Sequence, residues 1–240
     1  MACLYEGHHG PVTIHSYSAG GVFRECARKY QLLKIEGWRE REQRASARFG
    51  EAFESAIAHF YKQGCKPHTA VEGFDQKWKT FKNVPDLVYK DKEGDWAAMG
   101  RLGQQMAALY EVKAPVFGFT RPQFQQNYRK RVFEGGGELG NLEFTAWVDM
   151  LCEIEGKPFV IDIKTSSVAC PDHLMLDQQL RTYAWLTGVP NVGFLWGQKC
   201  GMTYKKGDHI TTLAGPPDFP SGTAGIVLYG EADHAVVLAP

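Results

Sequence analysis

The stretch from Phe144 to Ser167 places charged residues inside two apolar segments, and this pattern constrains the fold most strongly. Its sequence, FTAWVDMLCEIEGKPFVIDIKTSS, is rich in Val, Ile, Phe and Trp on both sides of the turn-prone EGKP. Such a pattern predicts two β-strands joined as a hairpin. Because an unpaired charge is costly to bury, charged side chains kept in such strands usually have partners. The segment therefore predicts a site as well as a hairpin.

The loop of this hairpin decides which charged residues meet. A two-residue loop at Glu155 and Gly156 places Asp149 directly opposite Asp162, with Cβ atoms about 5 Å apart. A loop shifted by one residue places Asp149 opposite Lys164 instead. Both registers leave the two aspartates and the lysine on one face, because side chains alternate along a strand. A three-residue loop would place Asp149 on the other face.

Asp149 and Asp162 would repel each other unless one is protonated or a cation lies between them. Carboxylate oxygens suit Mg²⁺ or Mn²⁺ better than zinc, and the sequence shows no matching set of His and Cys. Lys164, two residues after a metal carboxylate, can reach the same oxygens and stabilise a phosphate or orient a water. The three side chains together predict hydrolysis of phosphodiesters.

The pattern of an acidic residue followed two positions later by Lys occurs four times, so it decides nothing alone. The other three examples begin at Asp75, Glu111 and Glu155. The example at Asp162 is the one that lies in a strand-like apolar run with a second aspartate at hairpin distance upstream. Glu111 is the best rival, but it ends a predicted helix and has no equivalent partner upstream.

Four separated parts of the chain carry a resemblance to one family. Val148-Asp149 with Ile161–Ser166 matches an Asp that ends one strand, followed by Asp or Glu, any residue and Lys on the next. The other parts are Gln179–Tyr183, which matches a QxxxY motif, Tyr17–Tyr30, which contains a Cys-x-Arg-Lys-Tyr stretch, and Arg48–Glu54. In this order they resemble the PD-(D/E)xK nuclease superfamily, specifically its RecB-like and phage-exonuclease branch.

The resemblance implies an α/β fold with a central mixed β-sheet flanked by helices, the restriction-endonuclease-like core. With 240 residues and 44% hydrophobic content, the chain is expected to form a single nuclease domain over residues 1–240. Its expected parts are an N-terminal helical part to about residue 115, a catalytic sheet core at about 116–200 and C-terminal strands at about 201–240.

The resemblance also implies roles for the site residues. Mg²⁺ or Mn²⁺ would be held by Asp149, Asp162, the Ile163 carbonyl and Glu54, with Lys164 near the attacking water. Position 54 is Glu where the branch commonly has His, and glutamate is also a hard oxygen ligand. The expected catalytic residues are Asp149, Asp162 and Lys164.

Residues from the QxxxY motif and from two basic clusters are expected to contact DNA: Gln179, Tyr183, Arg24, Arg28, Arg129 and Arg131. The alternative for the basic clusters is a solvated surface with ion pairs. The alternative for the QxxxY pair is a core tyrosine with a surface glutamine. The formal net charge of zero is evidence against binding of nucleic acid by bulk attraction.

The expected function is that of a metal-dependent DNA nuclease. The resemblance favours an exonuclease that acts on DNA ends in recombination, repair or phage DNA processing and leaves 5′-phosphates. Two alternatives remain, a structure-specific endonuclease of the same superfamily and a catalytically idle nucleic-acid-binding scaffold. DNA is the expected partner, and a single-strand annealing protein or a helicase is the kind of protein that would deliver it.

The cysteines and the apolar runs bear on cofactor and location. Some relatives hold an iron–sulfur cluster through an upstream cysteine and three more near the C-terminus, but beyond residue 170 this chain has only Cys200. No iron–sulfur cluster is therefore expected, and Cys26 is expected to be a buried core thiol. The chain has no apolar run of membrane-spanning length and no signal-peptide pattern. We expect a protein without a membrane partner in the cytoplasm of a bacterial or phage-infected cell.

Hydrophobic periodicity predicts the order of the elements. Helices are predicted at 18–33, 40–63, 94–113 and 171–187, strands at 122–133, 143–152, 158–165 and 191–199, and a closing hairpin within 225–238. In the second helix one apolar stripe recurs at three- and four-residue steps: Ala45, Phe49, Ala52, Phe53, Ala56, Ile57 and Phe60. Glu54 lies at the edge of this stripe, where it can reach inward.

Overall fold

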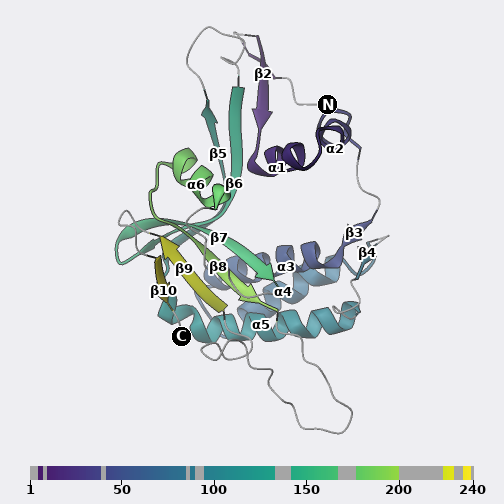
Figure 1. Cartoon of the computed structure of the whole chain (residues 1–240). Coiled ribbons are helices and arrows are strands. Elements are labelled where there is room, and N and C mark those ends of the chain that lie inside the picture. Colours follow the sequence, from purple (N-terminus) through teal and green to yellow (C-terminus); the bar gives the residue numbers. More distant parts are fainter. Residues whose placement is uncertain are drawn as a thin grey trace.

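The computed structural model of the chain describes residues 5–7, 10–38, 42–84, 87–89, 95–132, 142–166, 177–199, 224–229 and 235–238. Within them, a mixed β-sheet is flanked by helices (Figure 1), which confirms the predicted fold class. The sheet has the strand order β1-β2-β6-β7-β8-β9-β10, and β5 pairs with β6 beside this path. A separate pair of short strands joins β3 to β4.

Strands and helices have the following bounds. The strands are β1 (Tyr5–Gly7), β2 (Gly10–His15), β3 (Gln43–Arg44), β4 (Leu87–Val88), β5 (Thr120–Arg131), β6 (Leu142–Ile154), β7 (Lys157–Ser166), β8 (Val192–Gln198), β9 (Ala224–Tyr229) and β10 (Ala235–Leu238). The helices are α1 (Tyr17–Glu25), α2 (Ala27–Tyr30), the π-helix η1 (Gln31–Ile35), α3 (Ala45–Lys62), α4 (Thr69–Thr80), α5 (Trp96–Phe117) and α6 (Gln178–Thr187).

The larger hydrophobic core lies between the sheet and the helices α3, α4 and α5, which lie together on one side of it (Figure 1). The apolar stripe predicted for α3 is buried at every position. Phe49 makes an edge contact with Phe74 on α4, and Gly103 on α5 packs against the same Phe74 ring. A Cβ at Gly103 would lie 1.8 Å from Phe74 Cζ, so this close approach requires glycine. The core fixes the position of α3 beneath the sheet.

A smaller core lies on the opposite face, where α6 packs on β5 and β6. It contains Ala146 and Val148 from β6 and Leu180, Tyr183 and Leu186 from α6. β5 and β6 form a long antiparallel ribbon that projects away from α3–α5, with α6 beside it (Figure 1). The sheet therefore lies between the two cores.

The hairpin of β6 and β7 has one of the loops that the sequence leaves open, the two-residue loop at Glu155 and Gly156. Ile154 lies opposite Lys157, and the loop residues Glu155 and Gly156 have positive φ angles of 51° and 76°. Both values suit a type I′ turn, whose twist matches that of the strands. Of the two registers that keep the charged residues on one face, the structure has the one that places Asp149 opposite Asp162.

Two local predictions are wrong. The helix predicted over 18–33 is interrupted at Cys26, whose extended backbone ends α1 and begins α2. Its thiol is exposed and accepts a hydrogen bond from the Lys29 N–H, so it is a helix cap and not a core thiol. For the helix predicted over 171–187, the structure describes α6 from Gln178, with Asp177 as its cap, and residues 171–176 lie outside the described residues.

The other predicted helices and strands begin and end within five residues of the observed ones. The predicted closing hairpin is confirmed as β9 and β10, which pair in an antiparallel manner. The sequence did not predict the hairpin of β1 and β2, in which β2 pairs in parallel with the start of β6. Cys200 lies outside the described residues. Among the helices that the structure describes, none combines the length and apolar character that crossing a bilayer requires.

Candidate active site

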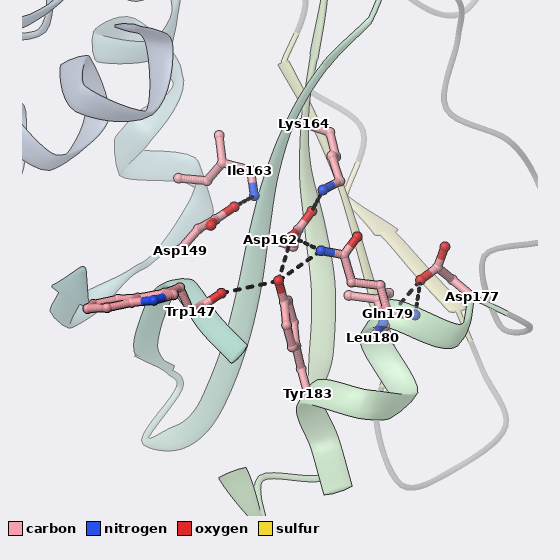
Figure 2. A network of polar contacts seen from close by, with 9 residues as sticks. All are labelled: Trp147, Asp149, Asp162, Ile163, Lys164, Asp177, Gln179, Leu180 and Tyr183. Carbon is pink, nitrogen blue, oxygen red and sulfur yellow. Dashed lines mark hydrogen bonds and ion pairs between the residues drawn. The ribbon is translucent and has the colours of Figure 1, made fainter. Parts of the chain in front are cut away.

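The ladder between β6 and β7 ends at Met150 and Ile161, and Asp149 lies at the point where the two strands separate. Asp149 Oδ2 accepts a hydrogen bond of 2.9 Å from the Ile163 N–H, so a side chain replaces the strand partner there (Figure 2). Within a strand, the N–H and C=O of one residue point to the same edge. The Ile163 carbonyl therefore faces the same opening as Asp149, which is where Asp162 also lies.

Asp162 is the most buried charged residue of the site, with 1% of its surface exposed. Its Oδ1 accepts hydrogen bonds from Gln179 Nε2 at 3.0 Å and from the Tyr183 hydroxyl at 3.3 Å (Figure 2). Its Oδ2 lies 2.6 Å from Lys164 Nζ in an ion pair. A cation bound at Oδ2 would share this oxygen with the lysine ammonium.

Glu54 reaches the site from α3, on the other side of the sheet edge. Its Oε1 accepts a hydrogen bond from Gln125 Nε2 on β5. Burial raises the pKa of Glu54, the hydrogen bond from Gln125 opposes this rise, and repulsion from Asp162 adds to it. The structure therefore brings Glu54 into the electrostatic neighbourhood of Asp162.

The three carboxylates all have pKa values above the ordinary range. Burial, followed by repulsion from Asp162 and Glu54, raises the pKa of Asp149 to about 7. Burial also raises the pKa of Asp162, and the Lys164 charge opposes that rise. Burial by itself would lower the pKa of Lys164, but attraction to Asp162 and Asp149 raises it, so the ammonium keeps its proton. The neighbouring lysine therefore compensates the negative charge of the site only in part.

A divalent cation fits this donor set. Within the described residues, no three His, Cys, Asp or Glu side chains are arranged to hold a metal by themselves. Each acid has a protein partner instead: Asp149 has the Ile163 N–H, Asp162 has Lys164, and Glu54 has Gln125. Mg²⁺ is typically held by one or two carboxylates and several waters. Asp149, the Oδ2 of Asp162 and the Ile163 carbonyl could supply such a site.

The sequence of residues 15–215 matches the family model of the PD-(D/E)XK nuclease superfamily. The chain belongs to this superfamily. It is therefore a nuclease that hydrolyses phosphodiesters of nucleic acid, and members of this superfamily typically use divalent metal ions. Among solved structures, the chain is similar to SSO0001, with 15% identity, a TM-score of 0.27 and coverage of 72% of this chain and 71% of that one. No curated protein matches the sequence.

Gln179 and Tyr183, the pair predicted as a QxxxY motif, lie against the Asp162 carboxylate. Gln179 and Tyr183 share one face of α6, as their spacing predicts, and both donate to Asp162 Oδ1. The Tyr183 hydroxyl also lies 3.2 Å from the Trp147 carbonyl and 2.8 Å from Gln179 Nε2. Burial raises the pKa of Tyr183, so the hydroxyl stays protonated and can donate. The described contacts hold Asp162 in place, and contact with DNA stays a prediction for both residues.

The four predicted arginines lie apart from the carboxylates. Arg24 on α1 donates to Gln178 at the start of α6, and Arg129 on β5 lies 3.4 Å from Asn127 Oδ1. Two are in exposed ion pairs: Arg28 lies 3.7 Å from a carboxylate oxygen of Glu36, and Arg131 lies 3.9 Å from one of Glu143. Ion pairs of this kind contribute little to stability. Their contact with nucleic acid stays a prediction.

Sequence reasoning missed Gln125, which is a hydrogen-bond partner of Glu54. The register of β5 and β6 places it opposite Asp149, and its side chain donates to Glu54. Its φ of 52° is a left-handed conformation that a non-glycine residue rarely adopts inside a strand. No sequence signal marks it, because glutamine in a polar strand is ordinary. The rival Glu111 has a structural role, since it accepts from the N–H groups of His68 and Ala70 at the start of α4.

Proposed function

We propose that this nuclease is a Mg²⁺-dependent deoxyribonuclease, an exonuclease of the RecB-like branch that acts on DNA ends and leaves 5′-phosphates. The observation that carries the proposal is Asp162. This carboxylate is buried, is held through Oδ1 by Gln179 and Tyr183, and has its Oδ2 beside Lys164. Asp149 and Asp162 are both buried with this one lysine, and a cation would balance their remaining negative charge.

Each residue has a task in the proposed reaction. Asp149, Asp162, the Ile163 carbonyl and Glu54 would hold the ion, which stabilises charge on the scissile phosphate when it is bound. Gln179 and Tyr183 fix Oδ1 of Asp162, so that Oδ2 points to the ion. Because Lys164 keeps its proton, it would act as a donor that orients water or stabilises a phosphate oxygen, and not as a base.

The preference for ends and the biological context rest on the resemblance to the RecB-like branch. Recombination, repair or phage DNA processing is the proposed setting, with a helicase or single-strand annealing protein as the proposed partner. The same core would serve a structure-specific endonuclease. A covalently closed circle separates the two, because an exonuclease needs an end and an endonuclease does not.

The test is cleavage of end-labelled linear and circular DNA with Mg²⁺, Mn²⁺ or a chelator. Asp162→Asn and Lys164→Met should each lower the cleavage rate by about 1,000-fold, which corresponds to about 4 kcal/mol of lost transition-state stabilisation. The matched controls are Glu155→Gln and Lys157→Met, which change the same tripeptide pattern in the exposed hairpin turn. These controls should cleave at the wild-type rate. Full activity in either site variant would contradict the assignment.

A further inference from the structure

The ribbon of β5 and β6 has one face covered by α6 and a second face with different chemistry. Ala146 and Val148 are buried against α6. Because side chains alternate along a strand, Thr145 and Trp147 lie on the opposite face of β6. Asp149 follows two residues later, about 7 Å along the strand. The alternation changes face at this residue, since Val148 lies in the smaller core and Met150 lies in the larger one. The uncovered face of the ribbon therefore extends up to Asp149.

Trp147 is exposed on this face, with 59% of its surface accessible. Figure 2 shows its indole extending away from Tyr183 and Gln179, on the same side as Asp149. Trp147 lies two residues from the acid Asp149. Contact between its apolar ring and water is unfavourable, so a ligand that covers the ring would be stabilised. The backbone of Trp147 is held in place, because β6 pairs with β5 at the residues before and after it and its carbonyl lies 3.2 Å from the Tyr183 hydroxyl.

The strand β5 supplies polar and basic neighbours on the same face. Asn127 lies directly opposite Trp147, and Arg129 and Arg131 follow at alternate positions toward the end of the ribbon. Asn127 Nδ2 donates to Thr145 Oγ1 at 3.1 Å, which fixes the amide beside the indole. Both arginines are exposed. The face thus presents an aromatic ring next to the active site, followed by two guanidinium groups, of which that of Arg131 lies 3.9 Å from a carboxylate oxygen of Glu143.

The chemistry of this face favours a nucleic-acid strand over a protein as its occupant. A protein interface usually centres on several apolar side chains, whereas the neighbours of Trp147 across the strand pair are polar or basic. A flat indole stacks on a base, and guanidinium groups beside it bind phosphates. A base inside a duplex is already stacked on both sides, so the ring can accept only an unpaired base.

We propose that Trp147 stacks on an unpaired base of the substrate next to the scissile phosphate, with Arg129 and Arg131 on the phosphates beyond it. The face is then a single-strand platform that begins at Asp149. The inference rests on the proposed deoxyribonuclease function and deepens it, because it specifies single-stranded DNA, or the single-stranded part of a DNA end, as the substrate at the site.

Binding without cleavage tests the platform directly. Fluorescence anisotropy in chelator compares a labelled single-stranded oligonucleotide with a blunt hairpin duplex, for wild type, Trp147→Ala and Trp147→Phe. Trp147→Ala should weaken single-strand binding by about 5- to 100-fold, the range for loss of one stacked base. Trp147→Phe should retain most of the affinity, and duplex binding should change by less than about twofold in both. The matched control is Trp38→Ala, which removes another exposed indole.

Cleavage and self-association complete the test. With Mg²⁺, Trp147→Ala should raise KM for single-stranded DNA by a similar factor and leave kcat close to wild type. Wild-type affinity of Trp147→Ala for single strands would overturn the platform, and so would equal losses on single strands and duplex. Sedimentation tests whether the face instead binds a second copy of the chain. If the wild type is a dimer and Trp147→Ala dissociates it, the platform is overturned too. Failure of the wild type to cleave any DNA would contradict the proposed function instead, while Trp147-dependent binding would remain measurable.

Discussion

Two glutamates three residues apart on α3 have opposite electrostatic surroundings. Glu51 lies 2.7 Å from both Arg48 and Lys77. Burial acts to raise its pKa, but hydrogen bonds and attraction from these two cations lower it. Glu54 has the neutral amide of Gln125 as its hydrogen-bond partner, and its pKa is raised. One helix thus carries a carboxylate whose charge is compensated within the protein and another whose charge is not.

Glu51 has the surroundings of a structural acid, whereas Glu54 has the surroundings expected of an acid that binds a ligand. Asp149 and Asp162 resemble Glu54, since burial raises the pKa of each and repulsion among the acids adds to the effect at Asp149. Clusters of this kind occur at functional sites, because they favour binding of a cation that relieves the repulsion. We therefore expect the two kinds of acid to differ in how their substitution changes the cleavage rate and in how the pH changes their contribution to stability.

The largest effect expected from the comparison is a pH dependence of stability without metal. Asp149 has a pKa of about 7 in the folded protein and an ordinary value of 3.8. Between these values the folded protein holds a proton that the unfolded chain has released, so stability falls as the pH rises from about 4 to 7. The loss is on the order of 3 kcal/mol at Asp149.

Urea unfolding in chelator at pH 5 and pH 8 measures this loss. Asp149→Asn is the matched variant, because its amide oxygen can still accept from the Ile163 N–H. The variant should lose less stability between the two pH values than the wild type. Glu54 and Asp162 act in the same direction and remain in both proteins. Identical pH dependence in wild type and Asp149→Asn would refute the raised pKa.

A pair of substitutions on α3 sharpens the comparison. Glu54→Gln should lower cleavage by about 30-fold, or about 2 kcal/mol, and raise the Mg²⁺ concentration needed for half-maximal rate. Glu51→Gln should leave cleavage within about twofold and lower the unfolding free energy by about 1 kcal/mol, since it removes two partly exposed ion pairs. Cleavage rates across a Mg²⁺ titration and urea unfolding check both. The comparison fails if Glu51→Gln lowers cleavage as much as Glu54→Gln.

The smallest predicted effect concerns the support of Asp162. Tyr183→Phe removes one of the two side-chain donors to Oδ1 and leaves Gln179 Nε2 in place. We expect about a tenfold loss of kcat, because a single hydrogen bond to a charged group contributes about 1.5 kcal/mol. Steady-state cleavage assays measure it. A loss confined to KM for DNA, with unchanged kcat, would instead assign Tyr183 to DNA contact.

The parts of the site that were predictable from the sequence are those set by local rules. The turn-prone EGKP segment limits the register of β6 and β7 to a few choices, and counting places Asp149, Asp162 and Lys164 on one face in two of them. The structure selects the loop at Glu155 and Gly156. Spacing on α6 likewise places Gln179 and Tyr183 on one face. Spacing does not tell which group that face meets, and the contact with Asp162 depends on packing between distant segments.

The unpredicted features depend on such long-range contacts or on backbone strain. The parallel pairing of β2 with the start of β6 joins segments more than 100 residues apart in the sequence, where no periodicity operates. Gln125 adopts its left-handed backbone within a strand whose sequence is ordinary, and its contact with Glu54 appears only once α3 lies beneath β5. No proline marks the break at Cys26, so no local rule predicts it.

Calorimetric titration with Mn²⁺ tests the central claim most directly, because it measures cation binding without DNA or catalysis. The wild type should bind Mn²⁺ with a dissociation constant in the micromolar to millimolar range. The double variant Asp149→Asn with Asp162→Asn should show no binding in this range, and Glu51→Gln should bind as the wild type does. Equal Mn²⁺ binding by the wild type and the double variant, or none by the wild type, would contradict a cation site between β6 and β7.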